Sequence, residues 1–262
     1  MKNRKRLFYD IETSQIIFKG WSTGKQFVGA HQIIEHSRII SIHWKWEGED
    51  EEVHNLDWGI NKQCDKSLIK KFIKELNKAD EIVAHNGDRF DIKWIRARAV
   101  FHGLEMRNHY NMIDTYKLSK ANLRIPSHSL KELCKYYGLA AKVDAGGIDT
   151  WDKIQFEKNQ EALDHLLYYG DGDIISLEAV YNKLRPYVKH KVNYAVLHGN
   201  TKFHCPECSH LGKWNKTYTT AAGTSQILML CRNTACKTYF KVNNKTYQDY
   251  LQFRMINGID QH

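Results

Sequence analysis

The segment Leu7–Thr13, with the sequence LFYDIET, places two acids two residues apart at the end of an apolar strand. Residues i and i+2 of a strand project from the same face, so Asp10 and Glu12 are expected to point the same way. Two carboxylates side by side repel each other unless a proton or a cation lies between them. The pair is therefore a candidate metal site, although acids at a strand end are also ordinary surface residues.

A second acid follows a second strand-like run. Ile82–Ala84 is apolar, and the polar turn His85–Phe90 leads from it into a helix that is expected to begin near Asp91. An acid at such a junction can simply cap the helix, and this interpretation applies to Asp88 and to Asp91 when either is taken alone.

A third acidic element, Tyr168–Asp173 with the sequence YYGDGD, lies inside a helical pattern expected over about residues 159–184. Tyr169 and Asp173 are four residues apart, so they share a helical face. Each of the two glycines costs about 1 kcal/mol relative to alanine inside a helix. We therefore expect another backbone or a substrate to approach closely here. Taken alone, the element also fits a polar helix surface with a partly buried tyrosine.

Together these elements form an ordered set of motifs. Asp-x-Glu, then Asn-x-x-x-Phe-Asp, then Tyr-x-x-x-Asp resemble the three exonuclease motifs of the DEDD (DnaQ-like) superfamily, over roughly residues 5–186. Residues 113–115 and 127–131 resemble connecting segments of its proofreading and phage-type members. The resemblance implies an α/β, ribonuclease-H-like fold with a mixed sheet flanked by helices. It also implies metal-dependent 3′-to-5′ exonuclease activity.

The resemblance assigns a role to each acid. It implies that Asp10, Glu12, Asp91 and Asp173 bind two Mg²⁺ or Mn²⁺ ions, and that Tyr169 orients the attacking water. The superfamily's other branch has a histidine five residues before its last acid. This chain has a tyrosine there, so the tyrosine branch fits.

The chemistry accounts for these residue types. Two cations about 3.5–4 Å apart stabilise the entering and leaving oxygens of an in-line displacement at phosphorus. Hard cations prefer oxygen, which matches four acids with no ligand histidine or cysteine. The resemblance further implies that Asn86 and Phe90 help to place the 3′-terminal nucleotide. Whether Asp171 also reaches a metal stays open.

Four of the six cysteines lie within 32 residues, as two pairs with two and four intervening residues: Cys205, Cys208, Cys231 and Cys236. In a chain without a secretion signal, this spacing favours a structural Zn²⁺ site over disulfides. The strand-like runs 217–220 and 226–230 predict the hairpin of a zinc ribbon. His204 and His210 are expected to be bystanders.

The predicted ribbon carries both positive charge and aromatic rings. Lys213, Trp214, Lys216 and Tyr218 combine the two features that single-stranded nucleic acid favours. From Val188 onward, ten Lys and Arg stand against three acids, which is +7 of the chain's net charge of +9. A ribbon that docks a protein or is purely structural remains the alternative.

We therefore expect an exonuclease domain over residues 1–187 and a zinc ribbon with a basic C-terminal segment over 188–262. The expected partner is nucleic acid, DNA rather than RNA, with a polymerase or another replication or repair protein in trans. No run approaches the roughly 18 apolar residues of a membrane span, which predicts a cytoplasmic protein, host-cytoplasmic if phage-encoded. The alternatives are an endonuclease or resolvase on the same fold, and a non-catalytic nucleic-acid-binding module.

Overall fold

The computed structural model describes residues 4–21, 24–25, 27–49, 52–139, 146–189 and 192–259. The chain divides into two compact units. The first unit is Lys5–Leu184, and the second unit is Arg185–His262 together with Met1–Arg4. The first unit ends at Leu184, three residues before the boundary expected at residue 187, and Arg4 belongs with the second unit.

The first unit is built on a five-stranded sheet with the order β5-β4-β1-β6-β7. Its strands are β1 (Arg6–Thr13), β4 (Ile39–Trp46), β5 (His54–Asp57), β6 (Glu81–Ala84) and β7 (Met112–Asp114). β1, β4 and β5 are antiparallel neighbours, whereas β6 and β7 run parallel to β1. The sheet is therefore mixed, as expected. The short strands β2 (Ile17–Phe18) and β3 (Ile33–Glu35) pair separately.

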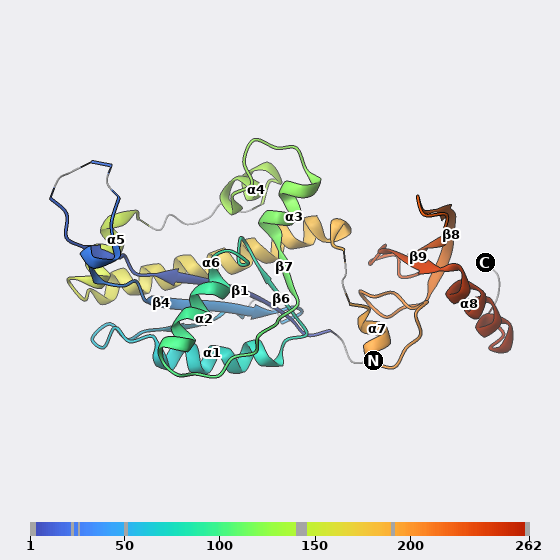
Figure 1. The fold of residues 1–262 in the computed structure, drawn as a ribbon, viewed down its shortest axis with the longest axis horizontal. Coiled ribbons are helices and arrows are strands. Elements are labelled where there is room, and N and C mark those ends of the chain that lie inside the picture. Colours follow the sequence, from blue (N-terminus) through green and yellow to red (C-terminus); the bar gives the residue numbers. More distant parts are fainter. Residues whose placement is uncertain are drawn as a thin grey trace. The chain divides into compact units, whose positions relative to one another are not determined.

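Six α-helices accompany this sheet in the described part of the first unit: α1 (Lys66–Lys78), α2 (Asp91–Phe101), α3 (Thr115–Asn122), α4 (Leu130–Tyr136), α5 (Ile148–Gln155) and α6 (Gln160–Leu184). The long helix α6 runs along the sheet in Figure 1. The two adjacent glycines at 146 and 147 predict a loop over residues 142–149. Residues 142–145 lie outside the described part of the chain, and α5 begins at Ile148, so the last two positions of that prediction were wrong. Among the described residues no helix is long and apolar enough to cross a bilayer.

The alternation of side chains along β1 decides what each face of the sheet contacts. Tyr9 packs against Phe72 of α1, with ring centroids 5.6 Å apart. Its neighbour Phe8 packs edge-on against Tyr181 of α6, at 5.4 Å. Helices α1 and α6 therefore cover opposite faces. Any residue of β1 in phase with Phe8 faces α6.

The second unit is a three-stranded antiparallel sheet of order β10-β9-β8, followed by a helix. Its elements are α7 (Tyr194–Leu197), β8 (Gly212–Thr219), β9 (Ser225–Cys231), β10 (Tyr239–Asn243) and α8 (Asn244–Ile256). The predicted hairpin is present as β8 and β9. The third strand and α8 were not predicted. Tyr250 of α8 is buried in a small core to which β9 and β10 also contribute.

Candidate active site and cysteine cluster

Three of the four predicted acids come together between β1 and α6. Asp10 and Glu12 are in phase with Phe8 and so face α6, which contributes Asp173. One carboxylate oxygen from each of these three acids lies within 4.8 Å of the other two. Asp173 is buried, whereas Asp10 and Glu12 are half-buried. A compact cluster of three anions needs a compensating cation, and carboxylate oxygens are suited to a hard divalent one.

The fourth acid, Asp91, lies on the β6 side of β1. The last paired residues of β1 and β6 are Phe8 and Val83. Beyond them, the Ile11 amide donates to the Asp91 carboxylate at 3.2 Å. Burial raises the pKa of Asp91 well above its ordinary value, and the neighbouring Asp10 carboxylate raises it further. Asp91 is thus adjacent to Asp10 and is held by the backbone of the strand that carries Asp10 and Glu12.

Tyr169 lies one helical turn before Asp173 and is hydrogen bonded to its carboxylate. Burial raises the pKa of Tyr169 well above its ordinary value, and the carboxylates of Asp173 and Glu12 add to this. The predicted tyrosine therefore belongs to the acidic cluster. Tyr168, the residue at the position of the other branch's histidine, is 64% exposed.

Asp171 is hydrogen bonded to residues of the sheet. It accepts hydrogen bonds from Asn55 of β5, at 2.9 and 3.1 Å, and it pairs with Nδ1 of His43 at 2.8 Å. Nε2 of His43 lies 2.9 Å from the hydroxyl oxygen of Ser41. Asp171 is not among the three acids that cluster.

His43, which contacts Asp171, and Ser41, which contacts His43, are cross-strand neighbours of the two acids of β1. Across the β1–β4 pairing, Asp10 is opposite His43 and Glu12 is opposite Ser41. Neither of these β4 residues was predicted from the sequence. The available signal was their polar character at alternate positions of an otherwise apolar run.

The two glycines of the third motif have different surroundings. A Cβ atom at Gly170 would lie 2.4 Å from the His43 ring, so a close neighbour is present there, but it is a side chain and not the backbone or substrate that was expected. A Cβ at Gly172 would meet nothing within 4 Å. Gly170 is therefore required by packing, whereas the described structure gives Gly172 no such reason.

The turn before Asp91 is fixed by another acid. Asp114, at the end of β7, accepts the Asn86 amide at 3.1 Å and the Asp88 amide at 3.3 Å. Asn86 has a φ of 66°, a conformation that asparagine tolerates better than most residues. Phe90 is 39% exposed. Both residues predicted to place the 3′-terminal nucleotide thus lie on the polar turn that leads to Asp91.

The sequence of the first unit matches a known family. Residues 7–185 match the model of the RNase_H superfamily. The chain belongs to the RNase_H superfamily. The chain is also 28% identical to the PolC-type DNA polymerase III of Ureaplasma parvum serovar 3, over 71% of this chain and 13% of that polymerase.

The fold of this RNase_H-superfamily chain is also similar to that of a solved structure. The family B DNA polymerase of Pyrobaculum calidifontis superposes with a TM-score of 0.54 at 15% identity, over 71% of this chain and 25% of the polymerase. This likeness concerns the fold. The chain spans a small part of the length of both polymerases.

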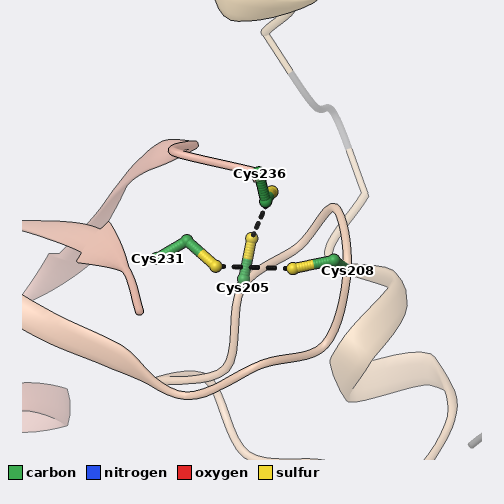
Figure 2. A group of neighbouring side chains, drawn as sticks. All are labelled: Cys205, Cys208, Cys231 and Cys236. Carbon is green, nitrogen blue, oxygen red and sulfur yellow. Dashed lines mark hydrogen bonds between the residues drawn. The ribbon is translucent and has the colours of Figure 1, made fainter. Parts of the chain in front are cut away.

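The four clustered cysteines meet in the second unit. Their sulfurs all lie within 4.8 Å of one another, with Cys205 and Cys236 3.9 Å apart and Cys208 and Cys231 3.4 Å apart (Figure 2). These distances exceed the roughly 2.05 Å of a disulfide. They fall near the ~3.8 Å that separates thiolates around a tetrahedral ion with Zn–S bonds of about 2.3 Å.

Backbone geometry supports the cysteine pairs. The amide two residues after Cys205 donates to its sulfur at 3.4 Å, and the amide two residues after Cys231 does the same at 3.4 Å. In the longer second pair, Asn233 accepts the Ala235 amide through its side chain and the Cys236 amide through its carbonyl. This turn accommodates the four intervening residues. His204 and His210 are not among the clustered ligands.

Glu207, between the first two cysteines, is buried and fully engaged. It accepts from Arg4 at 2.5 Å and from Arg185 at 2.6 Å. The Arg4 guanidinium also lies over the Tyr194 ring, 4.0 Å from its centroid. Glu207 therefore links the loop of the first cysteine pair to Arg4 and Arg185, the two residues of the second unit that adjoin the first unit in sequence.

Proposed function

We propose that the chain is a metal-dependent 3′-to-5′ exonuclease that hydrolyses single-stranded 3′ ends, with DNA favoured over RNA. The observation that supports this most directly is that carboxylate oxygens of Asp10, Glu12 and Asp173 lie within 4.8 Å of one another. The chain belongs to the RNase_H superfamily, and its fold is similar to part of a DNA polymerase. Tyr169 is hydrogen bonded to the same cluster. The combination fits the motif resemblance residue by residue.

Divalent Mg²⁺ or Mn²⁺ ions fit the acidic cluster, because three carboxylates of like charge converge there and a fourth, Asp91, adjoins Asp10. When bound, such ions supply Lewis-acid stabilisation of charge on the phosphodiester. Asp10, Glu12 and Asp173 would be their ligands, with Asp91 on the β6 side. The buried hydrogen bond from the Ile11 amide to the Asp91 carboxylate holds this fourth carboxylate beside β1.

Tyr169 positions the nucleophile in this proposal. An ordinary phenol has a pKa near 10, so its hydroxyl is protonated at neutral pH and acts as a hydrogen-bond donor and acceptor. Placed against Asp173, it can orient a water for in-line attack. Asn86 and Phe90 would place the terminal nucleotide, since they lie on the turn leading to Asp91.

The cysteine cluster is proposed to hold one structural Zn²⁺. Four sulfurs at near-tetrahedral spacing, with no open ligand position, match a closed zinc site. A polymerase or another replication protein is proposed as a partner in trans, on the basis of the similarity to polymerase chains.

The test is digestion of 5′-labelled DNA and RNA oligomers of matched sequence, with Mg²⁺ and without it. A ladder that shortens progressively from the 3′ end, and that a blocked 3′ end prevents, is the expected result. Asp10→Ala is the matched inactive control. Cutting of circular single strands would instead establish an endonuclease, and absence of cutting on all substrates would leave a binding module.

A further inference from the structure

One face of the sheet in the second unit is left open. Along β9, Ile227, Met229 and Cys231 are buried, whereas the alternate residues are only half-buried. The buried residues contact the core that includes Tyr250 of α8. The other face, made by the alternate positions, is on the opposite side from this core.

The strand register shows which side chains share the open face. Residues directly opposite one another in antiparallel strands project from the same side. The three rows across β8, β9 and β10 are Lys213–Leu230–Tyr239, Lys216–Leu228–Lys241 and Tyr218–Gln226–Asn243. We call these nine residues the open sheet face. It carries three lysines and two tyrosines around a central strip of leucine.

A β-bulge creates this arrangement. Lys213 and Lys216 are three residues apart, so in a regular strand they would point to opposite faces. The register shifts between Trp214 and Lys216, which admits one extra residue and returns Lys216 to the side of Lys213. Trp214 pairs with Met229 and therefore faces the other way. The predicted set of Lys213, Trp214 and Lys216 is thus split, with only the lysines on the open face.

Two contacts support this assignment. The Tyr218 hydroxyl donates to the side chain of Gln226 at 2.5 Å. The Lys241 ammonium lies over the Tyr218 ring, 5.1 Å from its centroid, although the two residues belong to the outer strands β10 and β8. The side chains of all three strands therefore meet on this face.

In the described part of the second unit, no acidic residue lies among the positively charged residues of the open sheet face. In the described part of the second unit the two acids are Glu207, which is buried against Arg4 and Arg185, and Asp249 of α8. Neither belongs to the open sheet face. Two hollows of about 450 and 480 Å³ adjoin β10, and Lys241 lines both.

We propose that the open sheet face binds a single strand of nucleic acid. Lys213, Lys216 and Lys241 would contact phosphates, and Tyr239, 55% exposed, would stack on a base. The half-buried leucines between the lysine-bearing strands give the bases an apolar floor. The inference rests on the proposed function for the identity of the partner, since a nuclease substrate is the polyanion that this chain must hold.

The test measures the Kd of a fluorescent oligodeoxythymidine at several salt concentrations, using full-length protein in the inactive Asp10→Ala background. Lys216→Ala and Lys241→Ala should each lower the salt slope by about 0.7, because each lost phosphate contact releases fewer counterions. The matched control is Lys245→Ala, which removes the same charge from an exposed position on α8. It should leave affinity and slope unchanged.

A tyrosine pair tests stacking separately. Tyr239→Ala should weaken binding roughly 5- to 150-fold, the range for one stacked base, whereas Tyr239→Phe keeps the ring and should bind nearly as the parent does. Bound zinc and the unfolding temperature are measured for every variant, to confirm an intact unit.

Equal affinities and slopes for the Lys216, Lys241 and Lys245 variants would overturn the inference and indicate a protein as the occupant of this face. Because binding is measured without cleavage, that result leaves the exonuclease proposal untouched. Conversely, weaker binding by the variants of the open sheet face but not by the Lys245 variant would support the inference. If the wild-type chain also cut no substrate, the proposed activity alone would be wrong.

Discussion

The two units place their candidate metal ligands differently with respect to the core. In the first unit the acidic cluster lies beside an extensive core in which Leu7, Ile42 and Phe72 are fully buried, and none of the clustered acids belongs to that core. In the second unit Cys205 and Cys231 are themselves members of a much smaller core. We therefore expect the first unit to fold without a contribution from the acids, whereas the cysteines are part of the core on which folding of the second unit depends.

The difference extends to electrostatics. Carboxylates that converge without a cation repel one another, so the acidic cluster opposes folding of the metal-free protein. Thiols are neutral until they bind a metal, and zinc binding to a site absent from the unfolded chain contributes directly to folding free energy. Removing a ligand should thus cost activity in the first unit and folding in the second.

The largest expected effect follows from removing an acid. Asp10→Ala or Asp173→Ala should lower turnover at least about 1000-fold, since the remaining ligands cannot act as a unit. The unfolding temperature should stay the same or rise, because a repelling charge is lost. Turnover in Mg²⁺ and thermal unfolding are measured together, with zinc content as the control for the second unit. Activity near that of the wild type would refute the assigned ligands.

A cysteine variant tests the other half of the comparison. Cys208 is half-buried and packs against the edge of the small core, and serine has nearly the same size, so Cys208→Ser removes one ligand with little loss of packing. We expect loss of zinc and unfolding of the second unit, since zinc contributes about 10–16 kcal/mol in small zinc domains. Turnover of a short oligomer at saturating concentration should remain near that of the wild type.

Calorimetry with metal analysis separates the outcomes of this experiment. A retained second transition in a zinc-free Cys208 variant would show that the core of the second unit folds without metal, and the contrast between the units would then fail.

A smaller effect is expected for Tyr169→Phe. This variant deletes only the hydroxyl bonded to Asp173, so metal affinity should persist while turnover falls roughly 10- to 1000-fold. Tyr168→Phe is the matched control, because Tyr168 is exposed and adjacent in sequence. Single-turnover rates and Mn²⁺ titrations measure the two quantities. If both variants turn over equally, Tyr169 has no part in the chemistry.

Local periodicity predicted which residues pair within the acidic cluster, and the motif resemblance implied that these pairs meet. The two-residue repeat of β1 put Asp10 and Glu12 on one face, and the four-residue spacing on α6 put Tyr169 with Asp173. The mixed sheet followed from the motif resemblance, and the order of its strands is now given by the structure.

Non-local contacts outside the three motifs could not be predicted from the sequence. The partner of Asp171 is His43, 128 residues earlier, and no local pattern connects the two. The face of Lys216 depends on a one-residue bulge, which reverses every side chain beyond it. The strand Tyr239–Asn243 has an apolar alternation of only two residues, Phe240 and Val242, and was missed for its shortness. The helix α8 after it lacks a recognisable apolar repeat, since it buries few residues.

The smallest expected effects distinguish the two glycines of α6. Gly170→Ala would drive a Cβ into the His43 ring and should destabilise the protein by about 1–3 kcal/mol, the usual cost of overpacking. Gly172→Ala meets nothing within 4 Å, so the better helix propensity of alanine should stabilise the protein by up to about 1 kcal/mol. Urea unfolding of both variants, in the absence of divalent metal, measures these opposite signs.

Turnover then reveals why Gly172 is a glycine. If Gly172→Ala is more stable but cuts more slowly, with a raised KM, the open space beside Asp173 is used by the substrate, which is the close approach that the third motif predicted. If stability rises and kinetics stay unchanged, Gly172 has no role in the acidic cluster. A loss of stability in Gly172→Ala would contradict the open surroundings described for it, and with them the contrast between the two positions.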